Sequence, residues 1–349
     1  MKIELGISTF GETTPLEKTG IAPSHPERIR QLVKEIELAD RVGLDIYGIG
    51  EHHRSDFAVS APEIVLAAGA VNTKHIRLSS AVTVLSSIDP VRAYQQYATI
   101  DALSNGRAEM MVGRGSFTES FPLFGYDLKN YEALFTEKLQ MLRTIVENET
   151  VTWEGHHTQS LDNTGIYPRS VQEKLPIWVA TGGNVESTVN IARQGLPITY
   201  AIIGGNPLRF KSLIEAYHAI GKQMGYPKDQ MQVAAHSWGF IADTSQEAKD
   251  KYFYPTKLLI EEIAKDRSNW VQTYRRQDFD IATGPGGAMF VGSPEEVTPK
   301  LIKMIEDLGL SRFMLHLPIG SMEHEDVLHA IELFGTQVAP AVREYFKDK

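Results

Sequence analysis

The choice between two parallel-sheet folds rests on Lys2-Ile3-Glu4-Leu5-Gly6-Ile7-Ser8 and on the residues that follow, Thr9-Phe10-Gly11-Glu12-Thr13-Thr14. Residues 2–8 alternate polar and apolar side chains, which is typical of a β-strand. An open, doubly wound sheet that binds a dinucleotide carries a G-x-G-x-x-G turn after its first strand, and residues 8–14 do not contain one. The beginning of the chain therefore favours a closed barrel over an open sheet.

Seven further strand-like segments follow, with helical patterns between them. The eight predicted strands are residues 2–8, 45–50, 76–84, 108–112, 177–180, 198–202, 232–242 and 312–317. Parallel strands need crossover helices, and closing the sheet removes its exposed edges. We therefore expect an α/β fold, a (β/α)8 TIM barrel with insertions in the loops, as a single domain over residues 1–349. The doubly wound sheet remains the alternative.

Two connections are too long for simple turns, at about 150–176 and about 245–291. The second contains Pro255 in a broken helical pattern and then Gly284-Pro285-Gly286-Gly287. Long loops on such a scaffold usually shape a site or are mobile. We expect both segments to be insertions, and the second is either a lid or a loop without a gating role. Directly after it, Ser293-Pro294-Glu295-Glu296 and Gly309 predict a helix over 294–308.

Composition excludes several classes of protein. The 349 residues include 35 Lys+Arg and 44 Asp+Glu, a net charge of -9, and no Lys/Arg block that nucleic acid or an anionic membrane would require. There is no cysteine, so disulfides, thiolate catalysis and Cys-ligated metals are excluded. The N-terminus lacks the pattern of a signal peptide, and no apolar run is long enough to span a bilayer. We expect a cytoplasmic protein.

Polar residues follow the second predicted strand directly, as Glu51-His52-His53-Arg54. The active sites of barrels lie at the carboxyl ends of their strands. If the strand continues that far, at most one of His52 and His53 faces the barrel mouth, because neighbouring strand residues point to opposite faces. That histidine is a candidate acid or base near neutral pH. The alternative is that both histidines only bond loop backbone.

The other histidines do not predict a metal site. His324 and His329 are five residues apart, which turns them about 140° from each other on a helix, so we expect them to be surface residues. The pair His156-His157 has no carboxylate at ligand spacing.

Two glycine-containing strand ends are candidates for a phosphate site. The fourth strand runs into Gly113-Arg114-Gly115-Ser116-Phe117, and the fifth ends in Thr181-Gly182-Gly183-Asn184 before a helical stretch. Glycine lets an anion approach backbone N–H groups, arginine offers a planar fork to phosphate oxygens, and a helix N-terminus attracts anions. In a protein of negative charge, these turns predict a local site for a phosphorylated ligand.

These motifs together resemble the bacterial-luciferase-like family of flavin-dependent monooxygenases. The resemblance rests on an ordered set that runs from about residue 3 to residue 340: Glu51-His52-His53, Ala81-Val82-Thr83-Val84-Leu85, Asp89-Pro90-Val91-Arg92, Asp101-Ala102-Leu103-Ser104-Asn105-Gly106-Arg107, Gly113-Arg114-Gly115 and Val291-Gly292-Ser293-Pro294-Glu295-Glu296.

The resemblance implies FMN, bound in its reduced form, and oxygenation of an organic substrate by O2. It implies that His52 is the catalytic histidine, with Glu51 assisting. It places the flavin at Ala81, Val82, Arg114, Gly115, Ser116, Gly182 and Gly183, with a cis peptide between Ala81 and Val82. A separate flavin reductase and a homodimer are also implied.

The family's second phosphate arginine is missing here, because Asn130-Tyr131-Glu132 stands in its place. FMN could therefore be a diffusing co-substrate. Phe10, Phe117, Trp178 and Ile202 suggest a pocket for an apolar substrate. Two alternatives remain: a deazaflavin-dependent hydride-transfer enzyme, which should need more cations than Arg114 alone, and a flavin-binding protein without turnover.

Overall fold

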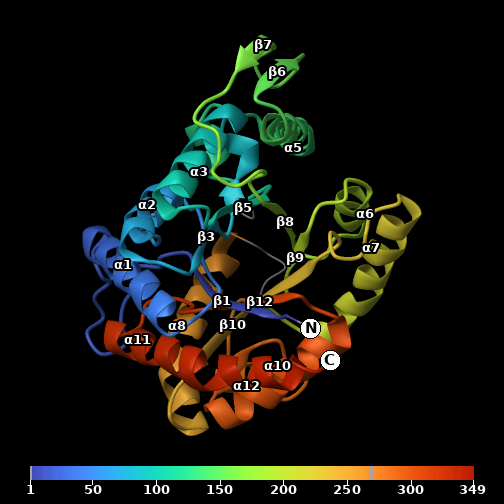
Figure 1. Ribbon diagram of the computed structural model, residues 1–349. Helices are drawn as coiled ribbons and strands as arrows, with labels where there is room; N and C mark the ends of the chain where they lie inside the picture. Colours follow the sequence, from blue (N-terminus) through green and yellow to red (C-terminus); the bar gives the residue numbers. More distant parts are fainter. Residues whose placement is uncertain (1, 116, 267–270) are drawn as a thin grey trace.

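The structure is a computed structural model, and it describes residues 2–115, 117–266 and 271–349. Eight parallel strands form a closed ring in the order β1-β2-β3-β5-β8-β9-β10-β12, and β12 pairs with β1 again (Figure 1). The predicted TIM barrel is thereby confirmed. The strands of the ring are β1 (Glu4–Thr9), β2 (Ile46–Ile49), β3 (Arg77–Ser80), β5 (Ala108–Gly113), β8 (Ile177–Thr181), β9 (Ile198–Ala201), β10 (Val233–Ile241) and β12 (Arg312–His316).

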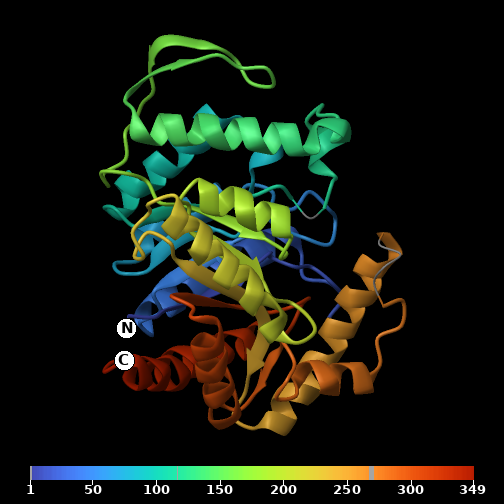
Figure 2. The ribbon, with the colours of Figure 1, turned by 90° about the vertical axis from the view of Figure 1, so that its right-hand side faces the viewer.

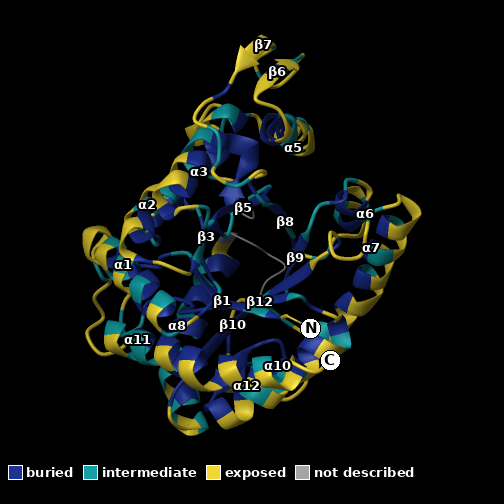
Figure 3. Ribbon diagram, in the orientation of Figure 1, coloured by how far each residue is buried: buried dark blue, intermediate teal, exposed yellow. Residues whose placement is uncertain are grey.

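Helices surround the ring and bury their apolar faces against it (Figures 1 and 3). They are α1 (His25–Arg41), α2 (Pro62–Asn72), α3 (Pro90–Ser104), α5 (Tyr131–Glu147), α6 (Val185–Arg193), α7 (Lys211–Gln223), α10 (Pro294–Leu308), α11 (His324–Leu333) and α12 (Ala339–Phe346). Within the described residues, no helix has the length and apolar character needed to cross a membrane.

The barrel interior is packed in layers below its carboxyl end. At the amino ends of the strands, Arg312 is buried between Glu4 and Glu109 and lies over the ring of Trp178 at 4.0 Å. Above this ionic layer lies a cluster of Ile46, Met111, Trp178, Ala234 and Met314. Side chains therefore fill the lower part of the barrel interior, and the larger of the two described cavities opens at its carboxyl end.

The segment 76–84, predicted as one strand, is divided. It forms β3 and then a short β4 (Thr83–Val84), with a cis peptide between Ala81 and Val82. Both β3 and β4 pair with β5. Ala81 lies against β2, where a Cβ at Gly48 would be only 2.9 Å from the Cβ of Ala81.

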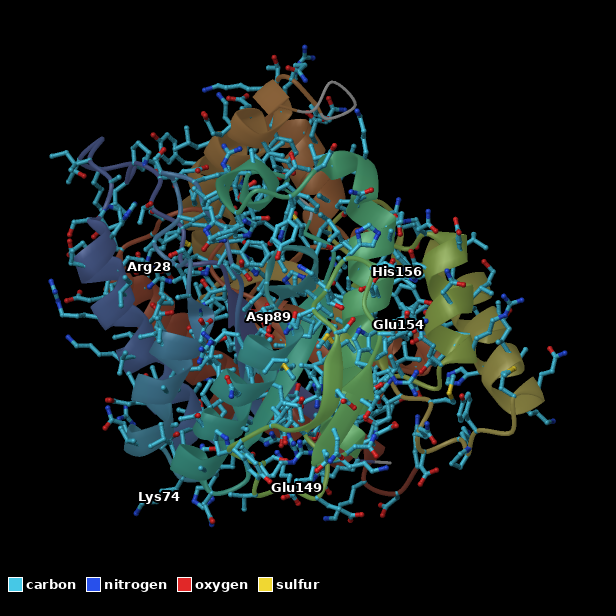
Figure 4. All side chains as sticks on the ribbon, turned by 90° about the horizontal axis from the view of Figure 1, so that it is seen from above. Arg28, Lys74, Asp89, Glu149, Glu154 and His156 are labelled. Atoms are coloured by element: carbon cyan, nitrogen blue, oxygen red, sulfur yellow. The ribbon has the colours of Figure 1, made fainter. Side chains whose placement is uncertain are left out.

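The first long connection forms an antiparallel hairpin of β6 (Thr150–Trp153) and β7 (Leu161–Gly165). The hairpin projects beyond α5 and is largely exposed (Figures 2 and 3). Figure 4 labels Glu154 and His156 on it. The carboxylate of Glu137 on α5 accepts the backbone N–H groups of His156, His157 and Thr158, which holds the hairpin turn against the helix.

The second long connection forms α8 (Ser245–Asp266), α9 (Arg276–Thr283) and β11 (Phe290–Gly292). The helices lie at the opposite end of the barrel from the two termini (Figure 2). The expectation of a helix broken at Pro255 was wrong, because α8 continues through it. Proline removes the backbone donor that would serve the carbonyl of Lys251, and in the next position the Thr256 hydroxyl donates to the Tyr252 carbonyl at 2.6 Å.

Candidate active site

A cavity of about 1050 Å³ opens at the carboxyl end of the barrel. Each of the eight barrel strands, or the loop directly after it, contributes lining residues, and so does the insertion that contains α8 and α9. Examples from the strands are Ser8, Ala81, Met111, Ala180, Thr199, His236 and Met314, while Ile260, Ile263, Tyr274, Asp278 and Ala282 come from the insertion. The cavity lies where the site of a TIM barrel is expected.

Most of the residues predicted from the sequence meet in this cavity. It is lined by Phe10, Glu51, His52, Ala81, Val82, Arg114, Gly115, Phe117 and Gly182. Gly183 follows immediately in the same turn, and Ser116 lies outside the described residues. The cavity thus brings together residues from the carboxyl ends of five different strands.

Two of the predicted pocket residues lie elsewhere. Along β9 and the loop after it, Thr199 and Ile203 line the cavity, whereas Ile202 is fully buried in the core outside it. The cause is strand alternation, which turns every second side chain outward. Trp178 belongs to the cluster inside the barrel, below the cavity. The expectation that Ile202 and Trp178 face the substrate was therefore wrong.

His52 lies among aromatic rings at the cavity wall. Its ring is stacked on Phe57, with centroids 4.3 Å apart, and meets the edges of Phe10 and Phe117 at 4.7 and 5.0 Å. Its side chain is 8% exposed, and its Nδ1 lies 3.9 Å from Oε1 of Glu119. Burial raises the pKa of Glu119, but His52 and the backbone N–H of His53 outweigh it and bring that pKa below its ordinary value. A largely buried imidazole and a partly exposed carboxylate thus face each other at the cavity wall.

Glu51 has a different set of contacts. One carboxylate oxygen lies 2.8 Å from Nε2 of His53, and the other accepts the backbone N–H of Val84 at 2.8 Å. Glu51 therefore holds the turn after the cis peptide against its own loop. Both His52 and His53 line the cavity, because β2 ends at Ile49 and strand alternation no longer applies at the histidines.

Arg114 joins three elements at the opposite part of the cavity. Its guanidinium donates to the carboxylate of Glu132 on α5 and, at 2.8 Å, to the hydroxyl of Ser187 on α6. The Tyr131 hydroxyl donates to the carbonyl of Gly115 at 2.7 Å. Where the family pattern places a second arginine, this chain therefore has an acidic partner for the first one.

The turn Gly182-Gly183 leads directly into α6. Gly183 has φ +95°, and a Cβ there would lie 2.6 Å from the ring of Phe210, so glycine is required. At Gly182 no atom lies within 4 Å of such a Cβ, so this turn is open. The Asn184 side chain accepts the N–H of Ser187, and the N–H groups ahead of it in the first turn have no intrahelical acceptor. Together with Arg114, these donors fit a phosphate group.

Sequence reasoning missed several lining residues. Arg209 lines the cavity from the loop after β9 and is a second cation near the glycine turns, beside Gly205. His236 and Trp238 line it from β10, and Glu119 from the loop after β5. The signal for Arg209 was the strand-end pair Gly204-Gly205. For His236 and Trp238 the direction of the side chains within β10 decides, and Glu119 lies in a loop that carried no such signal.

The remaining histidines have separate surroundings. Nε2 of His324 lies 3.4 Å from the buried Glu35, so His324 is not the surface residue we expected, and His329 pairs with Asp243 at 3.0 Å. Throughout the described ranges, no three His, Asp or Glu side chains are grouped as metal ligands.

Comparison with known proteins identifies the class. The family model of luciferase-like monooxygenases matches residues 3–312, and the chain belongs to this family. It is an oxidoreductase of the flavin-dependent monooxygenase class. It is 24% identical over 330 residues to the alkanal monooxygenase alpha chain of Aliivibrio fischeri, covering 87% of this chain and 90% of the relative. It is 26% identical over 307 residues to the N-acetyl-S-alkylcysteine monooxygenase of Bacillus subtilis, covering 84% and 88%.

Solved structures share the fold over nearly the whole chain. A monooxygenase from Streptomyces bottropensis has a TM-score of 0.81 at 22% identity, covering 97% of this chain and 99% of its own. The oxygenating constituent of the 3,6-diketocamphane monooxygenase of Pseudomonas putida, in complex with FMN, has a TM-score of 0.75 at 20% identity, with 97% of this chain and 98% of its own covered. The coenzyme F420-dependent tetrahydromethanopterin reductase of Methanopyrus kandleri has a TM-score of 0.73 at 19% identity, with 97% and 99% covered.

Proposed function

We propose that the protein is a monooxygenase that uses reduced FMN and O2 to oxidise a small, largely apolar organic molecule. The observation that carries this proposal is that one cavity joins a cation and two glycine turns at β5 and β8 to a buried histidine after β2. The luciferase-like relatives are named monooxygenases, and one structural neighbour is described in complex with FMN.

The phosphate would be held by Arg114, by the turn Gly182-Gly183 and by the N-terminus of α6. The pairing of Arg114 with Ser187 already directs the guanidinium toward that helix end. Glu132 offsets part of the positive charge, so the phosphate must compete with a carboxylate for the same donor. This competition supports FMN as a co-substrate that exchanges rather than as a permanently bound group.

The ring system would lie against Ala81 and Val82, between the phosphate donors and His52. When bound, reduced flavin supplies the electrons that activate O2. His52 has Nδ1 toward Glu119, which leaves Nε2 to hold or move a proton at a bound molecule. Phe10, Phe57 and Phe117 surround this imidazole and exclude water from it. Helices α8 and α9 cover part of the cavity, and we propose that they shield the reaction as a lid.

The test is anaerobic titration with reduced FMN, followed by rapid mixing with O2. We expect saturable binding and flavin reoxidation with kinetics that change in the His52→Ala variant. Failure to bind either reduced or oxidised FMN would refute the cofactor assignment. Binding with identical reoxidation in the wild type and in His52→Ala would favour a flavin-binding protein without turnover.

A second candidate is hydride transfer with a deazaflavin cofactor. The observation that favours it is Arg209, which adds a cation to the cavity beyond Arg114 and would suit a longer anionic tail. Titration with F420 beside FMN separates the two candidates, and Arg209→Ala should weaken F420 binding more than FMN binding if the tail lies there.

The proposal also includes a separate reductase that supplies the reduced flavin and a homodimer, both of which follow from the family resemblance. A reductase-coupled oxygen-consumption assay tests the first. Sedimentation velocity of the purified chain tests the second.

A further inference from the structure

Three neighbouring strands of the ring end beside the glycine turn that precedes α6. β5, β8 and β9 are adjacent in the ring, and the loops after them carry Arg114, the turn Gly182-Gly183 and Arg209 (Figure 1). Arg114, Gly182 and Arg209 all line the cavity. Because the carboxyl ends of parallel strands meet at one end of a barrel, the glycine turn has an arginine on each side.

A phenylalanine connects Arg209 with the glycine turn. The Arg209 guanidinium lies over the ring of Phe210, 5.0 Å from its centroid. The same ring packs against Gly183, where a Cβ would be only 2.6 Å from it. Gly183 directly precedes Asn184, the N-cap residue of α6. One aromatic ring therefore lies between the Arg209 guanidinium and the backbone that leads into α6.

Arg114 reaches the same helix end from the other side. Its Nη2 donates at 2.8 Å to the hydroxyl of Ser187, in the first turn of α6. Its Nη1 is paired with the carboxylate of Glu132. The two arginines therefore flank one helix N-terminus, and the charge of Arg114 is partly offset before any ligand binds.

The Arg209 charge is not offset in this way. Among the described residues, its guanidinium makes no hydrogen bond and no ion pair, and its side chain is exposed where it lines the cavity. It lies against the loop backbone at Gly205, where a Cβ would be 3.4 Å from Nη1. A guanidinium has five N–H donors in a planar fork that matches phosphate oxygens. Arg209 thus has all of its side-chain donors available to a ligand.

A phosphate ester at this helix end needs more than one cation. It carries a charge of about −1.5 to −2 at pH 7. Arg114 shares its single charge with Glu132, so it cannot balance the ester alone. The N-terminus of α6 adds only about half a positive charge. Arg209 is the other arginine in the described lining of the cavity, and it lies at this turn.

We propose that Arg209 binds the flavin phosphate from the loop after β9, opposite Arg114, and that it makes the site selective for phosphorylated over unphosphorylated flavin. The inference rests on the proposed function in that FMN is the flavin bound. It adds a binding residue from a third strand end and assigns Arg209 to the phosphate rather than to the longer tail of a deazaflavin.

The experiment is fluorescence titration of the protein with oxidised FMN, riboflavin and F420 at low salt. Riboflavin has the ring and the ribityl chain of FMN but no phosphate, so the ratio of the two affinities isolates the phosphate contacts. We expect Arg209→Gln to weaken FMN binding at least about tenfold, the value of a hydrogen bond to a charged group, and to change riboflavin binding less than about twofold.

Two further variants separate charge from shape and from position. Arg209→Lys keeps the charge without the fork and should recover part of the FMN affinity. Arg193→Gln is the matched control, because Arg193 is an exposed arginine in the last turn of α6, at the end of the helix away from the phosphate. We expect it to change FMN affinity less than about twofold, since the effect of a helix-end charge falls off within one turn.

Salt gives a second measure that does not depend on riboflavin. FMN affinity in the wild type should fall more steeply with added NaCl than in Arg209→Gln, because the variant has one exposed charge fewer at the phosphate. A merely structural role of Arg209 would lower the affinity and leave the salt dependence unchanged.

Three results would overturn the assignment: equal FMN affinity in the wild type and in Arg209→Gln, equal losses of FMN and riboflavin affinity in that variant, or a loss of F420 affinity that exceeds the loss of FMN affinity. Failure of the wild type to bind either FMN or riboflavin would instead refute the proposed cofactor, and the inference would fall with it.

Discussion

Arg114 forms an ion pair with Glu132, and this pair places an acidic side chain next to the main candidate for phosphate binding. The Glu132 side chain is 69% exposed, whereas that of Arg114 is 23% exposed. The carboxylate is therefore well solvated and can leave at low cost when a stronger anion arrives. The pair orients the guanidinium before the ligand binds and competes with the ligand afterwards.

We expect Glu132→Gln to tighten FMN binding about two- to fivefold at low salt, since an exposed ion pair is worth up to about 1 kcal/mol. Arg114→Ala should weaken it at least about tenfold, the value of a hydrogen bond to a charged group. Fluorescence quenching of FMN measures both, and Arg114→Lys is the control that keeps the charge without the fork. Weaker binding in Glu132→Gln would show that orientation of Arg114 outweighs competition.

The His52 site leads to a separation of binding from turnover. His52→Ala should keep FMN affinity within about threefold and lower kcat by at least about 100-fold, the usual contribution of a positioned acid or base. Glu119→Gln should have a smaller effect on kcat, because Glu119 acts through His52 at 3.9 Å. Product formation under reductase-coupled turnover measures both rates. Equal losses of FMN affinity and kcat in His52→Ala would indicate a binding role instead.

The barrel could be predicted because its signals are local. The helix predicted over 294–308 is observed at Pro294–Leu308 and ends at Gly309 with φ +63°. The Ser293 side chain, however, makes no capping bond there. The break at Ala81-Val82 could be placed only through the family resemblance, because alternation continues across it.

The predicted site residues that directly follow a strand lie at the cavity, whereas sequence reasoning missed lining residues that distant strands bring together. Glu12 and His316 are 304 positions apart, and no spacing pattern relates them. Ile202 has the residue type of a pocket wall, but its position along the strand turns it outward. Whether a strand side chain points into the barrel or outward depends on the register of the closed barrel. The periodicity of the sequence does not give that register.

The loop between α9 and β11 is fixed by one lysine. Nζ of Lys300 on α10 donates to the carbonyls of Thr283, Gly284 and Met289 at 3.0, 2.7 and 2.6 Å. The glycine-rich run 284–287 is therefore anchored at both ends. If α8 and α9 move as a lid, this loop restrains the movement.

We expect Lys300→Met to speed amide hydrogen exchange over residues 284–289 by about tenfold or more, since three carbonyls lose a charged donor. Hydrogen–deuterium exchange with mass spectrometry measures this. The control is Lys303→Met on the same helix, which removes only an exposed pair with Asp307. Equal exchange in both variants would show that the loop is held by its other contacts.

A buried ionic cluster joins α1, β2 and α11 on the flank of the barrel. The Glu35 carboxylate, with 0% exposure, accepts from the Arg28 guanidinium and, at 2.8 Å, from the Tyr47 hydroxyl, while His324 lies 3.4 Å away. Arg28 is also buried, and Figure 4 labels it. We expect Glu35→Gln to destabilise the protein by about 3–5 kcal/mol, because the Arg28 charge is left buried without its partner. Urea unfolding measures the change, and Glu37→Gln on the same helix is the control.

The cluster also predicts how stability depends on pH. Burial raises the pKa of Glu35, but Arg28 and His324 outweigh it and lower that pKa from 4.5 to about 2. A carboxyl with a lowered folded-state pKa stabilises the fold fully above pH 4.5 and loses its contribution as the pH falls toward 2. The wild type should therefore lose up to about 3 kcal/mol over this range through Glu35 alone. The Glu35→Gln variant has no carboxylate at this position and cannot lose this contribution. The difference in unfolding free energy between the wild type and Glu35→Gln should therefore narrow as the pH falls below 4.5. A difference that stays constant down to pH 2.5 would show that Glu35 titrates equally in the folded and unfolded chains.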